Sequence, residues 1–152
     1  LAIAGALAGA GATVAINGRD PDATMAKAGE LSLDGGRAFG VPFDVADLAA
    51  ARAGLGVVVD RHGAIDILVN NAGIQHRAPA LDFAHDDWER VLATNLTAPF
   101  ALAQVAAAHM QAAGSGRIIN VGSVLATVAR PTVPAYIASK TGLAGLTRAL
   151  AV

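Results

Sequence analysis

Short apolar runs alternate with longer amphipathic segments along the chain. Thr13–Asn17 and Ile65–Val69 are β-branched or apolar almost throughout, which is typical of strands buried on both faces. A weaker strand is predicted over Arg37–Phe43 and a further one over Arg117–Val121. Because segments with helical spacing separate these runs, the pattern predicts βαβ units. The expected fold class is α/β, with one doubly wound parallel sheet in a single domain.

The segments between the strands have helical spacing and recognisable end signals. Pro21 suits the first turn of a helix, and Gly11 is a typical residue to follow the end of one. Helices are predicted over Leu1–Ala10, Asp22–Leu33, Leu48 to about His62 and Asp86 to about Ala113, with a last helix after the loop Ser123–Pro134 that continues to Val152.

Both ends of the chain fall inside predicted helices. Leu1 opens directly into a helical pattern with no N-cap residue, and Gly142–Val152 contains no residue that would end the helix. We therefore expect residues 1–152 to be part of a longer domain.

Composition excludes several classes of protein. The 152 residues are 54% apolar and 15% charged, enough for a packed core, and a net charge of −1 gives no electrostatic footprint for nucleic acid or anionic lipid. The absence of cysteine excludes disulfides, thiolate zinc sites and a cysteine nucleophile. The four histidines do not fall at metal-ligand spacing, so we expect no metal site.

Two uncharged stretches do not fit a membrane span. Leu1–Ile16 would extend only about 24 Å as a helix, less than the hydrocarbon core of a bilayer, and glycines interrupt it. Val91–Gly116 contains polar residues at a density that favours burial in protein. We expect a cytoplasmic protein that acts on a small molecule, without a nucleic-acid or membrane partner.

Unusual polar or glycine-containing turns follow three of the predicted strands. They are Asn17–Arg19, Asn70–Gly73 and Gly122–Ser123. Since parallel strands end at the same edge of a sheet, and open α/β sheets bind ligands there, these turns predict the position of a ligand site.

Tyr136 and Lys140 are four residues apart on the last helix and therefore share a face. A phenol ionises only in alkaline solution, so it is a poor base unless a nearby cation stabilises the phenolate, and Lys140 could supply that cation. Ser123 could donate a hydrogen bond to a carbonyl or hydroxyl oxygen at the same point. A Tyr and a Lys at this spacing are also common on surface helices, so the pair alone does not distinguish a site from a solvated face.

The set of motifs resembles the short-chain dehydrogenase/reductase family. It consists of Asn70-Asn71-Ala72-Gly73, then Asn95, Ser123 and Tyr136-Ile-Ala-Ser-Lys140, with Asp44-Val45 also fitting the family's pattern. The resemblance covers essentially the entire chain, in the family's order and at its usual separations. It implies a Rossmann-like domain that binds NAD or NADP.

The resemblance also implies roles for individual residues. Tyr136 would be the general acid/base on the substrate, and Lys140 would assist it and bind the nicotinamide ribose. Ser123 would orient the substrate oxygen, and Asn95 would hold a water in the proton relay. An alternative reading of Asn95 is a structural residue that bends its helix.

Further residues would bind the cofactor. Asn71, Ala72 and Gly73 would pack along it, and Asp44 and Val45 would touch its adenine. The family's glycine-rich loop and first strand would precede Leu1, and the end of the sheet and the substrate lid would follow Val152. We therefore expect a polypeptide of residues 1–152 to be inactive by itself.

The turn Asn17-Gly18-Arg19 bears on the cofactor preference. An acidic residue at the end of this strand would bind the ribose 2′-hydroxyl of NAD, whereas an arginine accommodates the 2′-phosphate of NADP. Arg19 favours NADP. Asp20 is the competing signal, although a position before Pro21 is equally typical of a turn or cap residue.

A narrower resemblance is to dehydrogenases of sugar acids of the gluconate and 5-keto-gluconate type, carried mainly by residues 70–83. It predicts that Gln75, His76 and Arg77 face the substrate, and Arg77 could pair with a carboxylate. The alternative is that these are solvated loop residues. Gly122 and the run Val124–Ala126 depart from that group's pattern, which leaves a less polar substrate open.

Other functions fit part of the sequence. A reductase of 3-oxoacyl carrier protein or another sugar-alcohol dehydrogenase would share the same motifs. A non-catalytic nucleotide sensor tends to lack the Tyr or the Lys, and both are present here. The helices over 86–113 and 136–152 resemble the pair through which the family forms homodimers and homotetramers, so a purely structural role in assembly is a third reading.

Overall fold

Four short strands form two parallel pairs in residues 2–152, the part of the chain that the computed structural model describes. β1 (Thr13–Ile16) pairs with β2 (Arg37–Gly40), and β3 (Ile67–Asn70) pairs with β4 (Arg117–Asn120), in each case with the first residues of the two strands opposite one another. The predicted parallel strands are confirmed, although β2 ends three residues earlier than expected. The pairs belong to two compact units that divide between Gly63 and Ala64.

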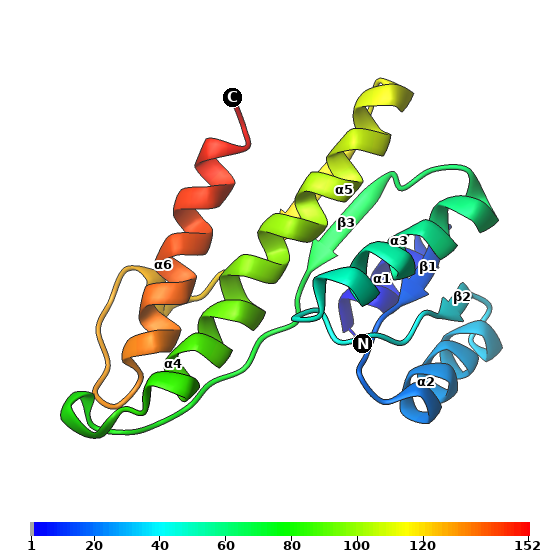
Figure 1. The fold of residues 1–152 in the computed structure, drawn as a ribbon. Helices are drawn as coiled ribbons and strands as arrows, with labels where there is room; N and C mark the ends of the chain where they lie inside the picture. The colour runs from blue at the N-terminus through cyan, green and yellow to red at the C-terminus, as the bar shows by residue number, and fades with distance from the viewer. Residues whose placement is uncertain (1) are drawn as a thin grey trace. The chain divides into compact units, whose positions relative to one another are not determined.

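In the first unit, three helices follow the predicted order. They are α1 (Ala2–Gly9), α2 (Pro21–Leu33) and α3 (Leu48–His62). Helix α2 packs on both strands, and α1 packs on β1 (Figure 1). The carboxylates of Asp20 and Asp47 cap α2 and α3 by accepting backbone N–H groups of their first turns.

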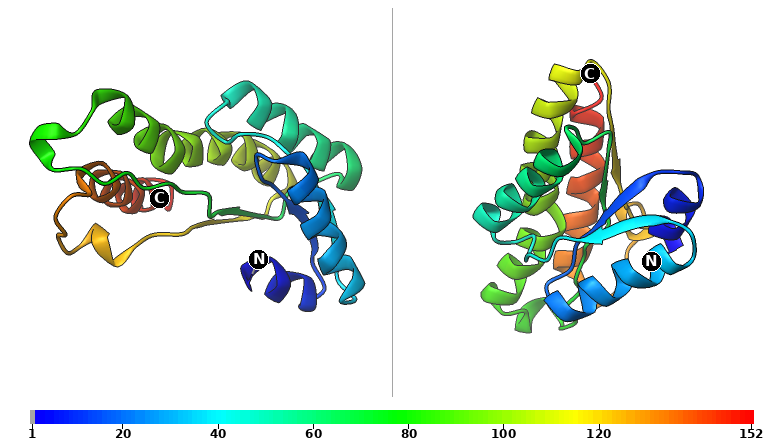
Figure 2. Two further views of the ribbon diagram at one scale, coloured as in Figure 1. Left: turned by 90° about the horizontal axis from the view of Figure 1, so that it is seen from below. Right: turned by 90° about the vertical axis from the view of Figure 1, so that its right-hand side faces the viewer.

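The second unit contains the longer helices and the larger apolar core. Helix α5 packs on β3 and β4, while α6 packs on α4 and β4 (Figures 1 and 2). Val91, Val133 and Leu143 are fully buried between these elements. The helical elements are η1 (Ala80–Asp82), α4 (His85–Leu92), η2 (Ala93–Thr97), α5 (Ala98–Ala113), η3 (Val124–Ala126) and α6 (Pro134–Ala149).

The structure refines two helix predictions. The helix expected from Asp86 to Ala113 is present over His85–Ala113, and it contains the π-helical turn η2, which was not expected. Pro99 has no N–H to donate to the carbonyl oxygen of Asn95, four residues earlier, so the α-helical ladder cannot pass through this point unchanged. The last helix ends at Ala149 rather than continuing to Val152.

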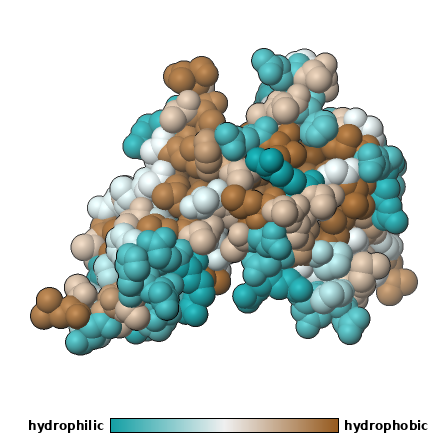
Figure 3. All heavy atoms as spheres, viewed as in Figure 1, coloured by the Kyte–Doolittle hydropathy of each residue, from teal (hydrophilic) through white to brown (hydrophobic). Residues whose placement is uncertain are grey.

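The surface mixes apolar and polar side chains on the face drawn in Figure 3. Leu81 and Val124, both in the second unit, are among the most exposed large apolar residues. By length and composition alone, the helical stretch His85–Ala113 would suffice to cross a membrane. Helices in the cores of soluble proteins pass the same test, and 44% of its most apolar window is buried, so this is weak evidence.

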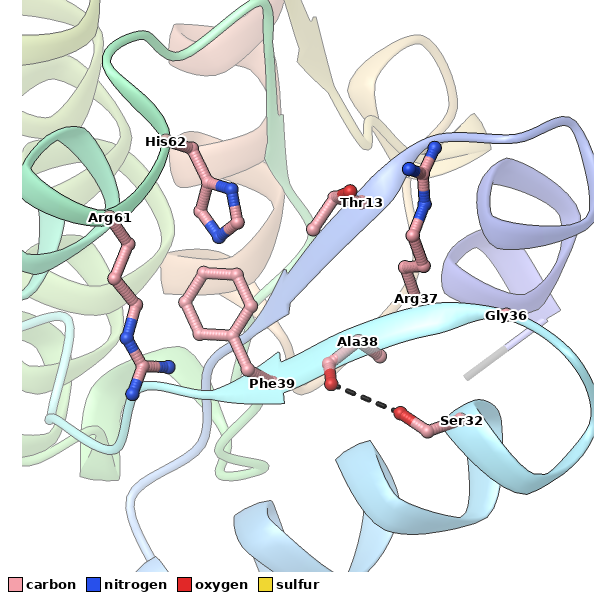
Figure 4. A pocket seen from close by; sticks show the side chains of 8 residues that line it. All are labelled: Thr13, Ser32, Gly36, Arg37, Ala38, Phe39, Arg61 and His62. Atoms are coloured by element: carbon pink, nitrogen blue, oxygen red, sulfur yellow. Dashed lines mark hydrogen bonds between the residues drawn. The ribbon is translucent and has the colours of Figure 1, made fainter.

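An open cavity of about 620 Å³ lies in the first unit, at the amino ends of β1 and β2. Phe39 stacks on His62 and lies beneath the guanidinium of Arg61, and Ser32 donates a hydrogen bond to the carbonyl oxygen of Ala38 (Figure 4). None of the residues that the sequence singled out for the site lines this cavity. Ligands of open α/β sheets bind at the opposite, carboxyl ends of the strands.

Candidate active site

An amide network joins the carboxyl ends of β3 and β4 in the second unit. Asn70 Nδ2 donates to Asn120 Oδ1 at 2.8 Å, and Asn120 Nδ2 donates to Thr147 Oγ1 on α6 at 2.9 Å. Asn70 is buried, and its Oδ1 has no hydrogen-bond partner within residues 2–152. The network fixes the strand ends from which the segments toward Gly73 and Ser123 depart.

Asn95 is fully buried in the π-helical turn η2, and each polar atom of its amide has a partner. Its Oδ1 accepts the N–H of Ile74 at 2.8 Å, and its Nδ2 donates to the carbonyl oxygen of Ile74 at 2.9 Å. The second proton of Nδ2 is directed to Ser139 Oγ at 3.1 Å. One side chain therefore connects the segment after Gly73 to helix α6.

Tyr136 and Lys140 occupy the first turns of α6, as predicted. Lys140 is buried, its Nζ donates to the carbonyl oxygen of Val121 at 2.7 Å, and it lies 5.9 Å from the centre of the Tyr136 ring. Burial lowers the pKa of the Lys140 ammonium. Tyr136 itself is half-buried. A cation is thus held beside the phenol, which is the arrangement that stabilises a phenolate.

Ser123 follows β4 in an extended conformation and is half-buried. Its Oγ accepts the N–H of Leu125 at 3.2 Å. This bond uses a lone pair, so the hydroxyl proton remains able to donate to an oxygen atom. Val121, which holds Lys140, lies two residues earlier on the same strand end.

Gly73 lies beside the Lys140 ammonium. A Cβ atom built at Gly73 would lie 3.5 Å from Asn95 Oδ1 and 3.8 Å from Lys140 Nζ, so a side chain there would stand next to the ammonium. Within residues 2–152, only one of the three N–H donors of Lys140 has a partner. Glycine at this position therefore keeps side-chain atoms away from an ammonium whose other two donors are unused. Asn71 and Ala72, which precede it, are exposed.

In the first unit, the turn after β1 contains Asn17, Arg19 and Asp20, whose side chains have different partners. Both N–H donors of the Asn17 amide are used, on the carbonyl oxygens of Val41 and Phe43, so only its Oδ1 is available to a ligand. Asp20 Oδ1 accepts the N–H of Ala23 at 2.9 Å as the cap of α2. Arg19 is exposed. Asp20 is therefore engaged as the cap residue that the sequence allowed, and Arg19 is the exposed charge beside it.

Packing against α2 also explains the glycine in this turn. A Cβ atom at Gly18 would lie 2.5 Å from Thr24 Oγ1. Thr24 is buried, and its hydroxyl donates to the carbonyl oxygen of Asp20 at 2.6 Å. After β2, Asp44 Oδ1 accepts the N–H of Ala46, and the side chain of Val45 is buried.

The three residues predicted to face a substrate differ in their surroundings. Gln75 and Arg77 are exposed. His76 is half-buried, with its Nε2 3.2 Å from Asp87 Oδ2 and its ring edge-on to Phe83. The His76 ring is thus oriented by α4, whereas the side chains of Gln75 and Arg77 make no ion pair or aromatic contact within the described part of the chain.

Two residues of the network were missed by the sequence analysis. Ser139 lies inside the Tyr136–Lys140 motif but was treated as a spacer, and Asn120 was treated only as part of a strand. A signal existed for Asn120, which is a polar residue in an otherwise apolar run, where burial requires partners. Asn120 also stands opposite Asn70 in the strand register.

A family model described as short chain dehydrogenase matches residues 1–152. The chain belongs to this family. Among curated relatives, it is 38% identical over 151 residues to gluconate 5-dehydrogenase of Gluconobacter oxydans, covering 99% of this chain and 59% of that enzyme. It is 41% identical over 150 residues to D-threitol dehydrogenase of Mycolicibacterium smegmatis, covering 99% of this chain and 58% of that enzyme. The chain thus spans about three fifths of the length of these relatives.

Solved structures give the same assignment. The crystal structure of a gluconate 5-dehydrogenase from Burkholderia cenocepacia, in complex with NADP and tartrate, is 44% identical and superimposes with a TM-score of 0.93. The match covers 97% of this chain and 58% of that one. The Rossmann-like α/β fold class inferred from the sequence is therefore confirmed.

Proposed function

We propose that the whole protein is an NADP-dependent dehydrogenase that interconverts a secondary alcohol and a ketone of a sugar acid. The observation that carries this proposal is the connected set Asn95, Tyr136 and Lys140, together with Ser123 at the end of β4. These residues supply an acid/base, a cation beside it and a hydrogen-bond donor, as carbonyl reduction requires.

Tyr136 protonates the substrate oxygen during reduction, and the Lys140 ammonium stabilises the phenolate that remains. Ser123 donates a hydrogen bond to the same oxygen and so orients it. Pro99 has no N–H and so cannot donate to the carbonyl oxygen of Asn95, which supports a role for Asn95 in holding a relay water. The hydride would come from NADPH when this cofactor is bound. Lys140 and the backbone of Asn71–Gly73 would hold it on the second unit.

The preference for NADP rests on Arg19 and Asp20. Arg19 is exposed, while the nearest carboxylate, Asp20, is engaged as the cap of α2. A guanidinium pairs well with a phosphate, and the carboxylate that would favour NAD is occupied. The Burkholderia relative was crystallised with NADP, which supports the same choice. Asn17, Asp44 and Val45 are proposed as further cofactor contacts of the first unit.

The sugar-acid substrate rests on the relatives and on Arg77. Two of the relatives act on gluconate by name, and tartrate, an anionic hydroxy acid, is bound in one of their structures. The exposed Arg77 could pair with a carboxylate, with Gln75 and His76 beside it. A polyol substrate is the second candidate, because D-threitol dehydrogenase is equally similar.

An assay of the whole protein with 5-keto-gluconate, an unrelated ketone and an acetoacetyl thioester, each with NADPH and NADH, tests the proposal. We expect turnover of the keto acid with NADPH, and its loss in Tyr136→Phe with cofactor binding retained. Turnover of the thioester or the simple ketone alone would contradict the sugar-acid assignment. Undiminished turnover by Tyr136→Phe would contradict the mechanism.

Replacing Arg19 tests the cofactor preference separately. Arg19→Gln should raise KM for NADPH by at least about tenfold, the value of one charge-assisted hydrogen bond, and leave KM for NADH unchanged. Arg52→Gln, an exposed arginine of α3, is the matched control. Equal effects on the two cofactors would contradict the role of Arg19.

We also propose that the whole protein is cytoplasmic. It would form a homodimer or homotetramer through residues 86–113 and 136–152. Phe100 and Leu150 are exposed large apolar side chains in or beside these segments, which supports their burial against a second copy. Light scattering of the whole protein measures the oligomeric state, and a monomer at micromolar concentration would contradict it.

A further inference from the structure

Ser139 is a fully buried hydroxyl within the motif that carries Tyr136 and Lys140. Its Oγ donates to the carbonyl oxygen of Tyr136 at 2.8 Å and accepts the N–H of Asn95 Nδ2 at 3.1 Å. Ser123, Tyr136, Lys140 and Asn95 account for the proposed chemistry without it. A buried polar group with two defined partners nevertheless restricts the geometry of both.

The direction of each hydrogen bond follows from the chemistry of the partners. The carbonyl oxygen of Tyr136 can only accept, so the single proton of Ser139 is committed to it. Ser139 can therefore only accept from Asn95. The orientation of the Asn95 amide is already set by Ile74, whose N–H and carbonyl oxygen face Oδ1 and Nδ2 respectively. All donors and acceptors in this group are matched in one arrangement.

Ser139 lies between the two members of the acid/base pair in the sequence. It lies three residues after Tyr136 and directly before Lys140, so it belongs to the turn that carries both. Its bond to Asn95 holds that turn against η2, and through Ile74 against the segment that follows Gly73. The hydrogen bond from Ser139 to the carbonyl oxygen of Tyr136 also adds a restraint in the first turns of α6, where the backbone N–H groups have fewer helical partners.

We propose that Ser139 is a positioning residue for the acid/base pair: through its two hydrogen bonds, it fixes the turn of α6 that carries Tyr136 and Lys140 against Asn95. This inference rests on the proposed function for its catalytic consequence. Without the hydroxyl, one N–H of Asn95 is left unpaired in the core, and Tyr136 can shift relative to Lys140 and Ser123.

The test compares the whole protein with its variants Ser139→Ala and Thr141→Val. Thr141 is the matched control, because it lies on the same helix but its hydroxyl bonds only to the carbonyl oxygen of Ala126, at 3.3 Å and in an exposed position. We expect Ser139→Ala to lower kcat about tenfold with little change in KM, the signature of an interaction lost in the transition state, and Thr141→Val to change neither.

A second measurement needs neither cofactor nor substrate. Hydrogen exchange of the Ile74 amide, which donates to Asn95 Oδ1, reports whether the Asn95 amide is still held in place. Ser139→Ala should speed this exchange relative to the amides of α5, and Thr141→Val should not. A role confined to stability would speed the exchange of all these amides by the same factor.

Each outcome decides the proposal. Unchanged exchange at Ile74 and an unchanged kcat in Ser139→Ala would overturn it, and so would losses of equal size in Thr141→Val. If Ser139→Ala does not fold, Ser139→Cys takes its place, because a thiol keeps the volume with weaker hydrogen bonds, and effects of the same sign but smaller size are then expected. If the whole protein reduces none of the offered ketones, the proposed function fails, whereas hydrogen exchange at Ile74 still tests Ser139.

Discussion

Thr132 has a left-handed backbone, with a φ of 69°, and it is alone in this among the non-glycine residues that the structure describes. Such a conformation costs an L-residue about 1–2 kcal/mol, and β-branched residues rarely adopt it. The carbonyl oxygen of Thr132 accepts the N–H of Ala78 at 3.0 Å. The strained residue thus joins the segment before α6 to the segment that contains Gln75–Arg77.

Relief of this strain should be measurable. We expect Thr132→Gly to raise the free energy of unfolding by up to about 1 kcal/mol, since the strain removed exceeds the greater freedom of glycine in the unfolded chain. Urea denaturation measures the change. Thr127→Gly, at a φ of −122°, is the control and should be destabilising. A loss of stability in both variants would show that Thr132 carries no strain.

Lys140 makes stability depend on pH with a defined sign. Burial lowers its pKa below 10.5, so between the lowered value and 10.5 the unfolded chain binds more protons than the folded chain. The contribution of Lys140 to the free energy of unfolding therefore rises with pH across this window, because the desolvation cost of the buried ammonium disappears. As pH rises from neutral toward 10.5, we expect the free energy of unfolding of the wild type to increase relative to that of Lys140→Met.

Urea denaturation of the two proteins at several pH values tests this expectation. Lys140→Met also loses the hydrogen bond to Val121, which changes its free energy of unfolding by an amount that does not depend on pH. The informative quantity is therefore the slope, against pH, of the difference between the two free energies of unfolding. A difference in stability that stays flat from neutral to alkaline pH would contradict a lowered pKa.

At the scale of the elements, helix α3 contains two glycines in opposite surroundings. A Cβ atom at Gly54 would overlap the ring of Phe43, whereas one at Gly56 would meet nothing within 4 Å. An alanine in a helix is about 0.5–1 kcal/mol more favourable than a glycine where space allows. Gly54 is therefore required by packing, and Gly56 only weakens the helix.

These two positions give opposite predictions within one helix. Gly56→Ala should raise the free energy of unfolding by about 0.5–1 kcal/mol, and Gly54→Ala should lower it by about 1–3 kcal/mol through overpacking. Thermal unfolding of both variants checks the pair. Stabilisation by Gly54→Ala would mean that Phe43 moves aside at little cost.

The elements also show where sequence patterns were sufficient. Helix α3 has the predicted bounds, because the Asp47 cap and the left-handed Gly63 at its ends are local signals. The π-helical turn was not predicted, although Pro99 was visible. Its geometry depends on the hydrogen bonds of Asn95 to Ile74 and Ser139, which lie 21 and 44 residues away, and no local pattern encodes such pairings.

At the scale of the whole molecule, the two compact units differ in the size of their buried residues. Leu143, Val91 and Val133, the largest fully buried apolar side chains, all belong to the second unit. The buried apolar residues of the first unit are mostly alanines and valines, such as Ala28, Val41 and Ala51. Stability should accordingly be distributed unevenly along the chain.

Hydrogen exchange can measure this distribution. In a polypeptide of residues 1–152, we expect the amides of α5 and of the β3–β4 pair to be protected at least about tenfold more than those of the β1–β2 pair, because opening the latter exposes less apolar surface. Equal protection of the two strand pairs would contradict the unequal cores. A polypeptide in which all amides exchange together would contradict two units.

The order and type of the elements could be predicted from periodicity and spacing, and the family resemblance singled out Asn95, Tyr136 and Lys140. The connections among these residues could not be predicted. The relay water on Asn95 stays a prediction, and the structure adds that its amide pairs with a backbone segment and with Ser139. Which polar side chains meet in a core depends on packing between elements, and sequence spacing constrains that only weakly.

The turn after β1 has a consequence for redesign of the cofactor preference. An engineer who wished to favour NAD over the proposed NADP would place a carboxylate near the end of β1. At Gly18, the new side chain would collide with the Thr24 hydroxyl, which is itself bonded to the carbonyl oxygen of Asp20. Recruiting Asp20 instead would uncap α2, at a cost of about 1 kcal/mol. Cofactor choice and the stability of α2 are therefore coupled, so a single substitution should not separate them, and a switch would have to remodel Thr24 as well.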